Sequence, residues 1–401
     1  MKIDYYLYTR KNSPYYLSRY TFPDGSKTVK STKTEDLQEA HKKANQFIAE
    51  YIAEQEAQLE KEKCSFDSGI TLREYAHDFF SMSGNHIQRL KSYNGFINDR
   101  WIMVKDEMLK NYILPFPIAE KKIKDITADD IDLFVLRLKP VKKKTDLSAN
   151  TKNKVLMILK IILKESVKDG IINYIPDFQR VKGESKVKDI LEPEELKKLF
   201  PYNWKDMYSH KSAYIGLMLT ATTGMRLSEV MGLQVKHINF DNRSIRIEQS
   251  WDTRLLKVNR FTKNKTIREV AICDRVTSEL KGFITEQGKD QDSFIFCREG
   301  TNKPYDDKFL PRHMEIAIQK AGIKVNHRYI TFHSFRHGVN TYLLEAGINP
   351  FKVAAFLGHS NKYNMTALYN KTGLKDQDDI RRYFQKLLTG QDNLVLLSKE
   401  A

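Results

Sequence analysis

The sequence is poor in cysteine and has no long apolar run. Its three cysteines, Cys64, Cys273 and Cys297, are too few and too scattered for a disulfide framework or a cysteine-based zinc site. No apolar stretch is long enough to span a membrane, and the polar, aromatic start MKIDYYLYTRKNS is unlike a signal peptide. We therefore expect a protein of the reducing cytoplasm, with no membrane among its partners.

Several motifs of familiar chemistry are also missing. The chain has no G-x-x-x-x-G-K-[ST] phosphate loop, no G-x-G-x-x-G, no H-E-x-x-H and no G-x-S-x-G. The nearest approach to a zinc helix is 331-TFHSFRHGVNTYLL-344, where His333 and His337 are four residues apart on a predicted amphipathic helix. Ser334 stands where a zinc helix carries glutamate, and Arg336 would repel the cation. We predict no metal and no cofactor.

Positive charge, in contrast, is abundant. The 401 residues include 67 Lys and Arg against 51 Asp and Glu, a formal net charge of +16, and the pI is about 9.4. Basic side chains that neutralise phosphates release condensed counterions, so such an excess suggests a polyanionic partner. A basic but ordinary enzyme would have the same composition, and the motifs must decide between the two.

Residues 1–63 predict a small β-sheet followed by one helix. Alternating aromatic runs flank an Asp-Gly turn at residues 23–25, which is a hairpin signal, and Thr34 is positioned to cap the helix. We expect the apolar face of this helix to contain Leu37, Ala40, Ala44, Phe47, Ile48 and Tyr51. On the sheet, Arg19 and Lys30 are candidate DNA contacts. The alternative is that basic strand residues only protect the sheet edges.

Residues 70–178 are predicted to be wholly helical. Thr127 and Ser148 are expected to cap two helices, and a long helical stretch is expected around residues 88–112. Before Ser148, the loop residues Lys142 and Lys143 are candidate DNA contacts, although a lysine run in a loop is more often simply solvated.

Three further segments follow. Residues 179–189 form a basic, exposed interdomain linker in which Lys182 and Lys186 are candidate DNA contacts. Residues 190–385 predict a mixed domain with helices at both ends and a strand-rich centre. Residues 386–401 form a tail with a short apolar run at 394–397, which either docks on a neighbouring protomer or frays.

The residues with chemical potential lie in the mixed domain. His333 and Arg336 are three apart on one helix face, and an arginine presents a planar fork to phosphate oxygens. Arg226 lies at the start of a predicted helix after Gly224 in 221-ATTGMRLSEVMGLQ-234, and 357-LGHSNKYNMTALYNK-371 supplies His359 and Tyr369. Two arginines suit a phosphorus centre whose charge no metal neutralises. Each residue alone has a plainer interpretation, such as a surface arginine, a turn histidine or one of 20 tyrosines.

Taken together, these motifs resemble those of tyrosine recombinases of the phage and conjugative-element integrase type. They are T-G-M-R-L-S-E-V, F-H-S-F-R-H, L-G-H-S and T-x-x-Y, in that order. His333 comes 107 residues after Arg226, His359 comes 26 residues after His333, and Tyr369 comes 10 residues after His359. The resemblance covers residues 70–385 well and the first 63 more loosely. It implies a multidomain fold: a small N-terminal β-sheet plus helix module that binds arm sites, an all-α SAM-like core-binding domain and a mixed α+β catalytic domain.

The resemblance also implies roles for residues. Tyr369 would attack a DNA phosphodiester to leave a 3′-phosphotyrosyl link, while Arg226 and Arg336 hold the non-bridging oxygens. His333 and His359 would donate to the phosphate, with His333 assisting proton removal. A lysine on a β-hairpin would protonate the leaving 5′-oxygen, and the hairpin 262-TKNKTIREVAI-272 offers Lys263, which we favour, or Lys265. Supporting roles are implied for Glu229 and His337, and Tyr363 is a less favoured alternative nucleophile.

The partners follow from the same resemblance. They would be double-stranded DNA at attachment core sites and arm sites, further copies of the chain in a homotetramer, and accessory DNA-bending or excision factors, in a bacterial, nucleoid-associated setting. The alternatives are a type IB-like topoisomerase, a catalytically silent DNA-binding regulator on a recombinase scaffold, and a metal-dependent DDE transposase. No carboxylate set supports the transposase.

Overall fold

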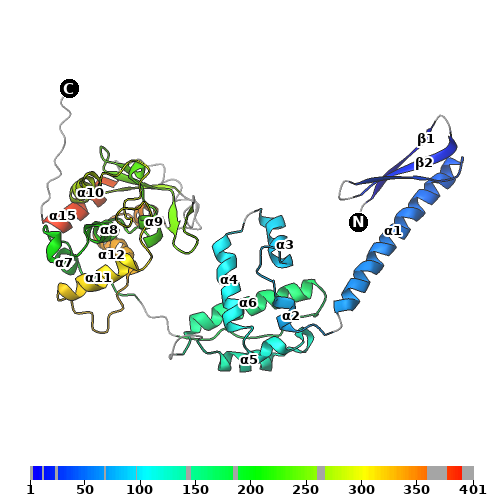
Figure 1. The fold of residues 1–401 in the computed structure, drawn as a ribbon, viewed down its shortest axis with the longest axis horizontal. Helices are drawn as coiled ribbons and strands as arrows, with labels where there is room; N and C mark the ends of the chain where they lie inside the picture. The colour runs from blue at the N-terminus through cyan, green and yellow to red at the C-terminus, as the bar shows by residue number, and fades with distance from the viewer. Residues whose placement is uncertain are drawn as a thin grey trace. The chain divides into compact units, whose positions relative to one another are not determined.

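The fold comes from a computed structural model. It describes residues 3–10, 13–22, 26–66, 69–95, 97–140, 146–183, 188–259, 267–358 and 377–390, with the backbone alone for 55–66. The chain divides into two compact units, Met1–Glu184 and Ser185–Ala401, and each is described by itself (Figure 1). Among the described residues, no helix is both long enough and apolar enough to cross a membrane.

The N-terminal part of the first unit is a three-stranded antiparallel sheet followed by a long helix. The strands are β1 (Asp4–Arg10), β2 (Ser13–Thr21) and β3 (Lys27–Ser31), with β2 in the middle, and the helix is α1 (Leu37–Phe66). Alternation along the strands gives the sheet one face against α1, where Tyr20 is fully buried and its ring lies 4.6 Å from that of Phe47. The predicted sheet-plus-helix arrangement is confirmed.

Two details of this module differ from the sequence prediction. The helix cap is Asp36 rather than Thr34, because the Glu39 amide donates to Asp36 Oδ1 at 2.7 Å while the Thr34 hydroxyl bonds to the Glu39 carboxylate. Leu37, expected on the apolar face, is 48% exposed because it lies in the first turn, beyond the edge of the sheet contact.

The rest of the first unit is helical, as predicted. Its elements are α2 (Leu72–Ala76), α3 (Asn85–Asn94), α4 (Asp99–Tyr112), the 3₁₀ turns η1 (Pro117–Glu120) and η2 (Ile123–Asp125), α5 (Ala128–Arg137) and α6 (Ala149–Lys168). Thr127 and Asp130 form the expected capping box, and Ser148 caps α6. The helical stretch expected around 88–112 is instead two helices, since Gly95 adopts φ 66° and ends α3.

The second unit is mixed. Its helices are α7 (Pro193–Leu199), α8 (Lys211–Thr223), α9 (Leu227–Met231), α10 (Asp274–Glu286), α11 (Phe309–Lys320), α12 (Phe332–Glu345), α13 (Pro350–Leu357) and α15 (Asp378–Thr389), with the short turns η3 (Trp204–Asp206) and η4 (Val235–His237). The strands β4 (Ile238–Asn239), β5 (Ser244–Ile247) and β8 (Arg268–Ala271) form one antiparallel sheet, and β6 (Ser250–Asp252) pairs with β7 (Lys257–Asn259). The predicted strand-rich centre is therefore present.

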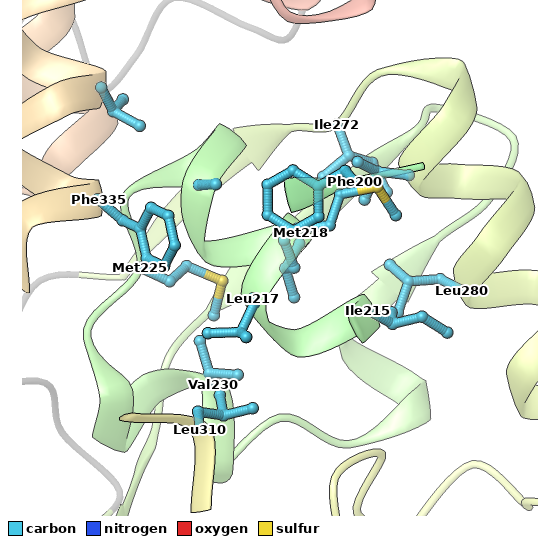
Figure 2. Packing of buried hydrophobic residues seen from close by; sticks show 14 of the residues in the cluster. Phe200, Ile215, Leu217, Met218, Met225, Val230, Ile272, Leu280, Leu310 and Phe335 are labelled. Carbon is cyan, nitrogen blue, oxygen red and sulfur yellow. The ribbon is translucent and has the colours of Figure 1, made fainter. Parts of the chain in front are cut away.

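Helix α8 is the centre of this unit. Every residue of α8 from Ser212 to Thr223 is buried, which is the property of a helix enclosed on all sides rather than of a surface helix. It contacts α9, α10, α11 and α12, and Figure 2 shows its Ile215, Leu217 and Met218 among side chains from several of these elements. A rigid α8 gives the segment that follows it a fixed starting point.

Candidate active site

The end of α8 determines where Arg226 lies. Gly224 ends the helix with φ 63°, and a Cβ on it would lie 2.4 Å from Cδ2 of Leu357, so only glycine fits this tight approach. Arg226 then precedes α9. Its backbone N–H donates to Glu229 Oε2 at 2.9 Å and its Nη1 donates to Glu229 Oε1 at 2.7 Å. The predicted helix start after Gly224 is confirmed, and Glu229 holds Arg226 directly.

Glu229 is only 2% exposed and has a second arginine partner. Arg268, at the start of β8, donates from Nη2 to Glu229 Oε2 at 2.7 Å and from Nη1 to Oε1 at 3.2 Å. Burial by itself would raise the pKa of Glu229. The charges and hydrogen bonds of Arg268 and Arg226 outweigh burial and lower the pKa to about 2. The carboxylate is therefore ionised throughout the neutral range.

Arg336, on α12, is also buried, at 4% exposure. Its Nη1 donates to the Gly224 carbonyl at 2.8 Å, and its Nη2 donates to the Leu357 carbonyl. Burial and the neighbouring charges of Arg226 and Arg268 lower the pKa of Arg336 to about 9, so the guanidinium stays charged at neutral pH. The side chain is thus held by backbone oxygens in the interior of the unit.

The three arginines share one feature, the carboxyl end of α13. Arg268 Nε donates to the Phe356 carbonyl at 3.1 Å, Arg336 donates to the carbonyl of Leu357, and Arg226 Nη2 reaches the Gly358 carbonyl at 3.3 Å. Three successive carbonyls therefore accept from three different guanidiniums. Cations are stabilising at the C-terminus of a helix, where the last carbonyls lack intrahelical partners.

His333 and His337 lie on the exposed side of α12. Their rings meet edge to face, with centroids 4.9 Å apart and planes at 84°. Although part of its ring is exposed, desolvation lowers the pKa of His333, helped by the charges of Lys188 and Arg336. His333 is neutral at pH 7 and has one ring nitrogen free to accept a proton. Among the residues that the structure describes, no group of three or more His, Cys, Asp and Glu could hold a metal ion.

Several predicted residues lie outside the described residues. They are His359, Tyr369, Lys263, its alternative Lys265, Tyr363, and the candidate DNA contacts Lys142, Lys143 and Lys186. Their predicted roles stay predictions. In sequence, His359 comes immediately after the described Gly358, and Lys263 and Lys265 lie shortly before β8.

The two candidate DNA contacts of the N-terminal module are on opposite faces of its sheet. Lys30 is on the side of α1, where its Nζ lies 3.6 Å from the centre of the Phe47 ring. Arg19 is on the other face, where its Nη1 donates to the hydroxyl of Tyr6 at 2.9 Å. Tyr6 and Val29, which pair with Arg19 across the sheet, are 51% and 41% exposed. Only Arg19 therefore belongs to the face that α1 leaves open.

A basic groove on α6 was missed in the sequence. It has a volume of about 310 Å³, and Lys154, Lys160, Met157, Phe178 and Arg180 are among its lining residues. No carboxylate within the described parts of the chain forms an ion pair with either lysine. The sequence contained a signal, because Lys154, Lys160 and Lys164 recur at helical spacing between the apolar positions of α6. The predicted contact Lys182 is exposed close by in sequence.

Arg268 was missed as well, and it too left a signal in the sequence. In the strand REVAI, Arg268 alternates in phase with Val270 and Ile272, both buried. A charged residue at an inward position of a strand needs a buried partner of opposite charge. That partner is Glu229, for which the sequence predicted only a supporting role.

Comparison with known proteins identifies relatives of this chain. The phage integrase family matches residues 189–374. A tyrosine recombinase of Pseudothermotoga lettingae is 24% identical over 269 residues, which are 66% of this chain and 85% of that protein. The tyrosine recombinase XerA of Pyrococcus horikoshii is 24% identical over 251 residues, covering 62% of this chain and 77% of that protein.

Solved structures agree in fold. The Tn1549 transposon integrase, in complex with a circular intermediate DNA, has a TM-score of 0.57 at 20% identity and covers 73% of this chain and 96% of that one. A lambda integrase dimer bound to a COC′ core site has a TM-score of 0.55 at 16% identity, with 92% and 95% coverage. At these identities the likeness shows a shared multidomain integrase fold, with a small N-terminal sheet and a mixed catalytic domain.

Proposed function

This chain is a member of the phage integrase family of tyrosine recombinases through its residues 189–374, and from this premise we propose how its residues cut and rejoin DNA. It is a site-specific DNA recombinase that acts through a tyrosine. Integration or excision of a mobile element is the biological reaction we propose, since the integrase that it matches in fold belongs to a transposon.

The proposed reaction is a transesterification. The phenolic oxygen of Tyr369 attacks the scissile phosphorus while His333, held neutral by its surroundings, takes the phenolic proton. The bond from phosphorus to the 5′-oxygen breaks, its electron pair leaves with that oxygen, and Lys263 supplies the proton. The products are a 3′-phosphotyrosyl ester and a free 5′-hydroxyl. Reversal with a different 5′-hydroxyl rejoins the strand without any external energy source.

The observation that carries this assignment is the arginine cluster at the end of α13. Arg226 and Arg336 converge on residues 357 and 358, next to His359, and carry more positive charge than Glu229 can neutralise. A phosphodiester that becomes pentavalent concentrates negative charge on its non-bridging oxygens, and preorganised donors are most effective there. Arg226, whose side chain is 23% exposed, is the donor that solvent and DNA can reach.

DNA recognition is assigned to other surfaces. We propose that residues 70–178 form a SAM-like core-binding domain that meets DNA through the α6 groove, and that residues 1–63 bind arm sites through the Arg19 face. Residues 179–189 would be the basic linker, 190–385 the catalytic domain and 386–401 a tail that docks on a neighbouring protomer. The lambda integrase tetramer bound to a Holliday junction supports a homotetramer during strand exchange. Accessory DNA-bending or excision factors complete the proposal.

One experiment tests the nucleophile. The substrate is a nicked duplex containing the sequence that the protein itself selects from a random pool, and the reaction is run in EDTA. Wild type should form an SDS-resistant protein–DNA adduct, and Tyr369→Phe should form none while binding the same DNA. Tyr363→Phe is the matched control and should form the adduct normally. An adduct from Tyr369→Phe would refute the nucleophile, and its absence from wild type would refute the proposed function.

A further inference from the structure

Arg268 has no role in the reaction described above, yet it is among the most constrained side chains of the catalytic unit. It is 5% exposed, and its three donor nitrogens reach two elements other than its own strand: Glu229 of α9 and the carbonyl of Phe356 at the end of α13. A buried guanidinium has a high desolvation cost unless every donor is satisfied. Each of the three nitrogens of Arg268 makes a hydrogen bond, and the acceptors belong to Glu229 and to the end of α13.

The contact with Glu229 connects Arg268 to Arg226. Both oxygens of the carboxylate accept from Arg268, and both also accept from Arg226, one from its side chain and one from its backbone. Both oxygens of Glu229 are therefore held by two arginines. If Arg268 is shortened, the carboxylate can rotate toward the gap, and the guanidinium of Arg226 would follow it.

The contact with α13 connects Arg268 to Gly358, the residue that ends this helix. Gly358 has φ 66°, and a Cβ on it would lie 2.9 Å from Nη1 of Arg268, so the backbone of Gly358 rests directly on the guanidinium. The Gly358 carbonyl in turn accepts from Arg226. Where α13 ends, Gly358 is thus in contact with two arginines, Arg268 and Arg226.

We propose that Arg268 is a positioning residue for DNA cleavage: by bridging Glu229 and the end of α13, it aims Arg226 at the scissile phosphate. This inference rests on the recombinase function proposed above. Arg268 does not touch DNA in the proposal. It acts on the phosphate-holding side of the site rather than on the leaving-group side, although its strand follows the lysine hairpin.

The chain contains a matched control. Arg275 on α10 is 8% exposed and likewise donates to carbonyls, those of Leu388 and Phe200, and to the Tyr214 hydroxyl. It differs in having no contact with Glu229 or with α13 among the described residues. Loss of Arg275 should destabilise the same unit without moving Arg226.

The test compares Arg268→Lys, Arg268→Met and Arg275→Lys on three nicked duplexes: the ordinary phosphodiester, a neutral methylphosphonate at the scissile position, and a 5′-bridging phosphorothiolate. The methylphosphonate needs less positive charge around phosphorus, while the thiolate leaves without a proton. On the phosphodiester, both Arg268 variants should form adduct about 100-fold more slowly than wild type, the effect expected when a catalytic group is displaced by about 1 Å. Arg275→Lys should react at the wild-type rate.

The substrates then separate the possible causes. The deficit of Arg268→Lys should shrink on the methylphosphonate and persist on the phosphorothiolate. Rescue by the phosphorothiolate alone would place the defect at the lysine, and rescue by neither would make Arg268 merely structural; either outcome overturns the inference. Binding affinity and thermal unfolding identify a variant that has not folded, and Arg268→Lys keeps the test open if Arg268→Met does not fold. If wild type forms no adduct on any substrate, the recombinase function itself fails.

Discussion

Each unit of this chain buries one glutamate against arginine, but the two sites differ in charge balance. In the helical unit, Glu165 accepts from Arg89 at 3.0 Å and from Lys168 at 2.6 Å, and Arg89 also reaches Asp169 at 2.5 Å. Two carboxylates therefore meet two cations. In the catalytic unit, the only carboxylate in contact with Arg226 and Arg268 within the described residues is Glu229, and Arg336 adds a third positive charge.

We interpret this difference as separating a structural cluster from the cluster that we propose to bind phosphate. The helical cluster is closed, since its carboxylates and cations satisfy one another, and the Tyr75 hydroxyl completes it by donating to Asp169 at 2.6 Å. The cluster of Arg226, Arg268 and Arg336 has surplus positive charge, which is offset by backbone carbonyls at the end of α13 and by the Gly224 carbonyl at the end of α8. The arginines tolerate this surplus without a bound anion because the carbonyl oxygens carry partial negative charge. The remaining positive charge can attract an anion. Burial and ion pairing alone would not have distinguished the two sites.

The largest effect should come from removing the acid of each cluster. Glu229→Gln should destabilise the catalytic unit by about 3–5 kcal/mol, because it leaves buried guanidiniums without a counter-charge. Glu165→Gln should have a smaller effect on the helical unit, since Asp169 still neutralises Arg89. Hydrogen exchange in increasing urea, read on peptides of α8 and α6, would measure the two units separately. Equal losses would remove the distinction between the clusters.

An acid titration is the control for this prediction. The folded pKa of Glu229, about 2, lies below its ordinary value of 4.5. The carboxylate therefore contributes its full stabilisation above about pH 4.5, about 3 kcal/mol, and loses it as the pH falls toward 2. In Glu229→Gln the stability of α8 should no longer depend on this ionisation. A variant that retains the full acid dependence of wild type would assign it to other groups.

Replacing one arginine in each cluster should affect the rate of DNA cleavage in only one of the two cases. Arg226→Lys keeps the charge but loses the fork that spans Glu229 and Gly358, so adduct formation should fall about 10²–10³-fold, as for the loss of one preorganised donor. Arg89→Lys, in the closed cluster, should leave the cleavage rate of bound DNA unchanged. Single-turnover adduct formation at saturating protein measures both. A comparable loss from Arg89→Lys would contradict the functional distinction.

A pair of glycines tests how tightly the end of α13 is built. Gly358 and Gly390 both end helices in the left-handed region, at φ 66° and 71°, but only Gly358 has a neighbour within 4 Å of an added Cβ, namely Arg268. Gly390→Ala should lose about 1–2 kcal/mol for the strained backbone alone. Gly358→Ala should lose more and should also slow adduct formation, because it displaces Arg268. Equal unfolding free energies and unchanged cleavage would show that this approach has no consequence.

The sequence predicted the parts of this site that follow a linear pattern. Arg226, His333 and Arg336 followed from the order and spacing of short motifs, and the helix start after Gly224 followed from the local sequence. Arg268 did not, because its inward position in a strand shows only that a partner is needed, and that partner is 39 residues away. The contact of three arginines with the end of α13 could not be predicted either, because backbone carbonyls are the same in every residue type.

In the N-terminal module, too, local patterns were predicted and features that depend on three-dimensional geometry were not. The sheet and α1 were predicted because their periodicities are local. Asp36 rather than Thr34 caps the helix, and which of these neighbouring side chains becomes the cap depends on backbone geometry. Lys30 and Arg19 appeared equivalent until strand pairing put them on opposite faces. Whether a basic side chain can contact DNA depends on the face of the sheet on which it lies. Its position in the sequence alone does not show which face that is.

The smallest effects should come from the α6 groove, where single lysines meet phosphates. Lys154→Gln and Lys160→Gln should each reduce the slope of log binding constant against log salt by about 0.9, because each removes one counterion-releasing contact. Lys110→Gln is the matched control: Lys110 is exposed on the same unit but is already paired with Asp106 at 2.7 Å. Fluorescence anisotropy on a labelled duplex between low and moderate salt measures the slopes. If Lys110→Gln changes the slope as much as the groove variants do, the unit binds DNA through diffuse charge, and the α6 groove has no special part in recognition.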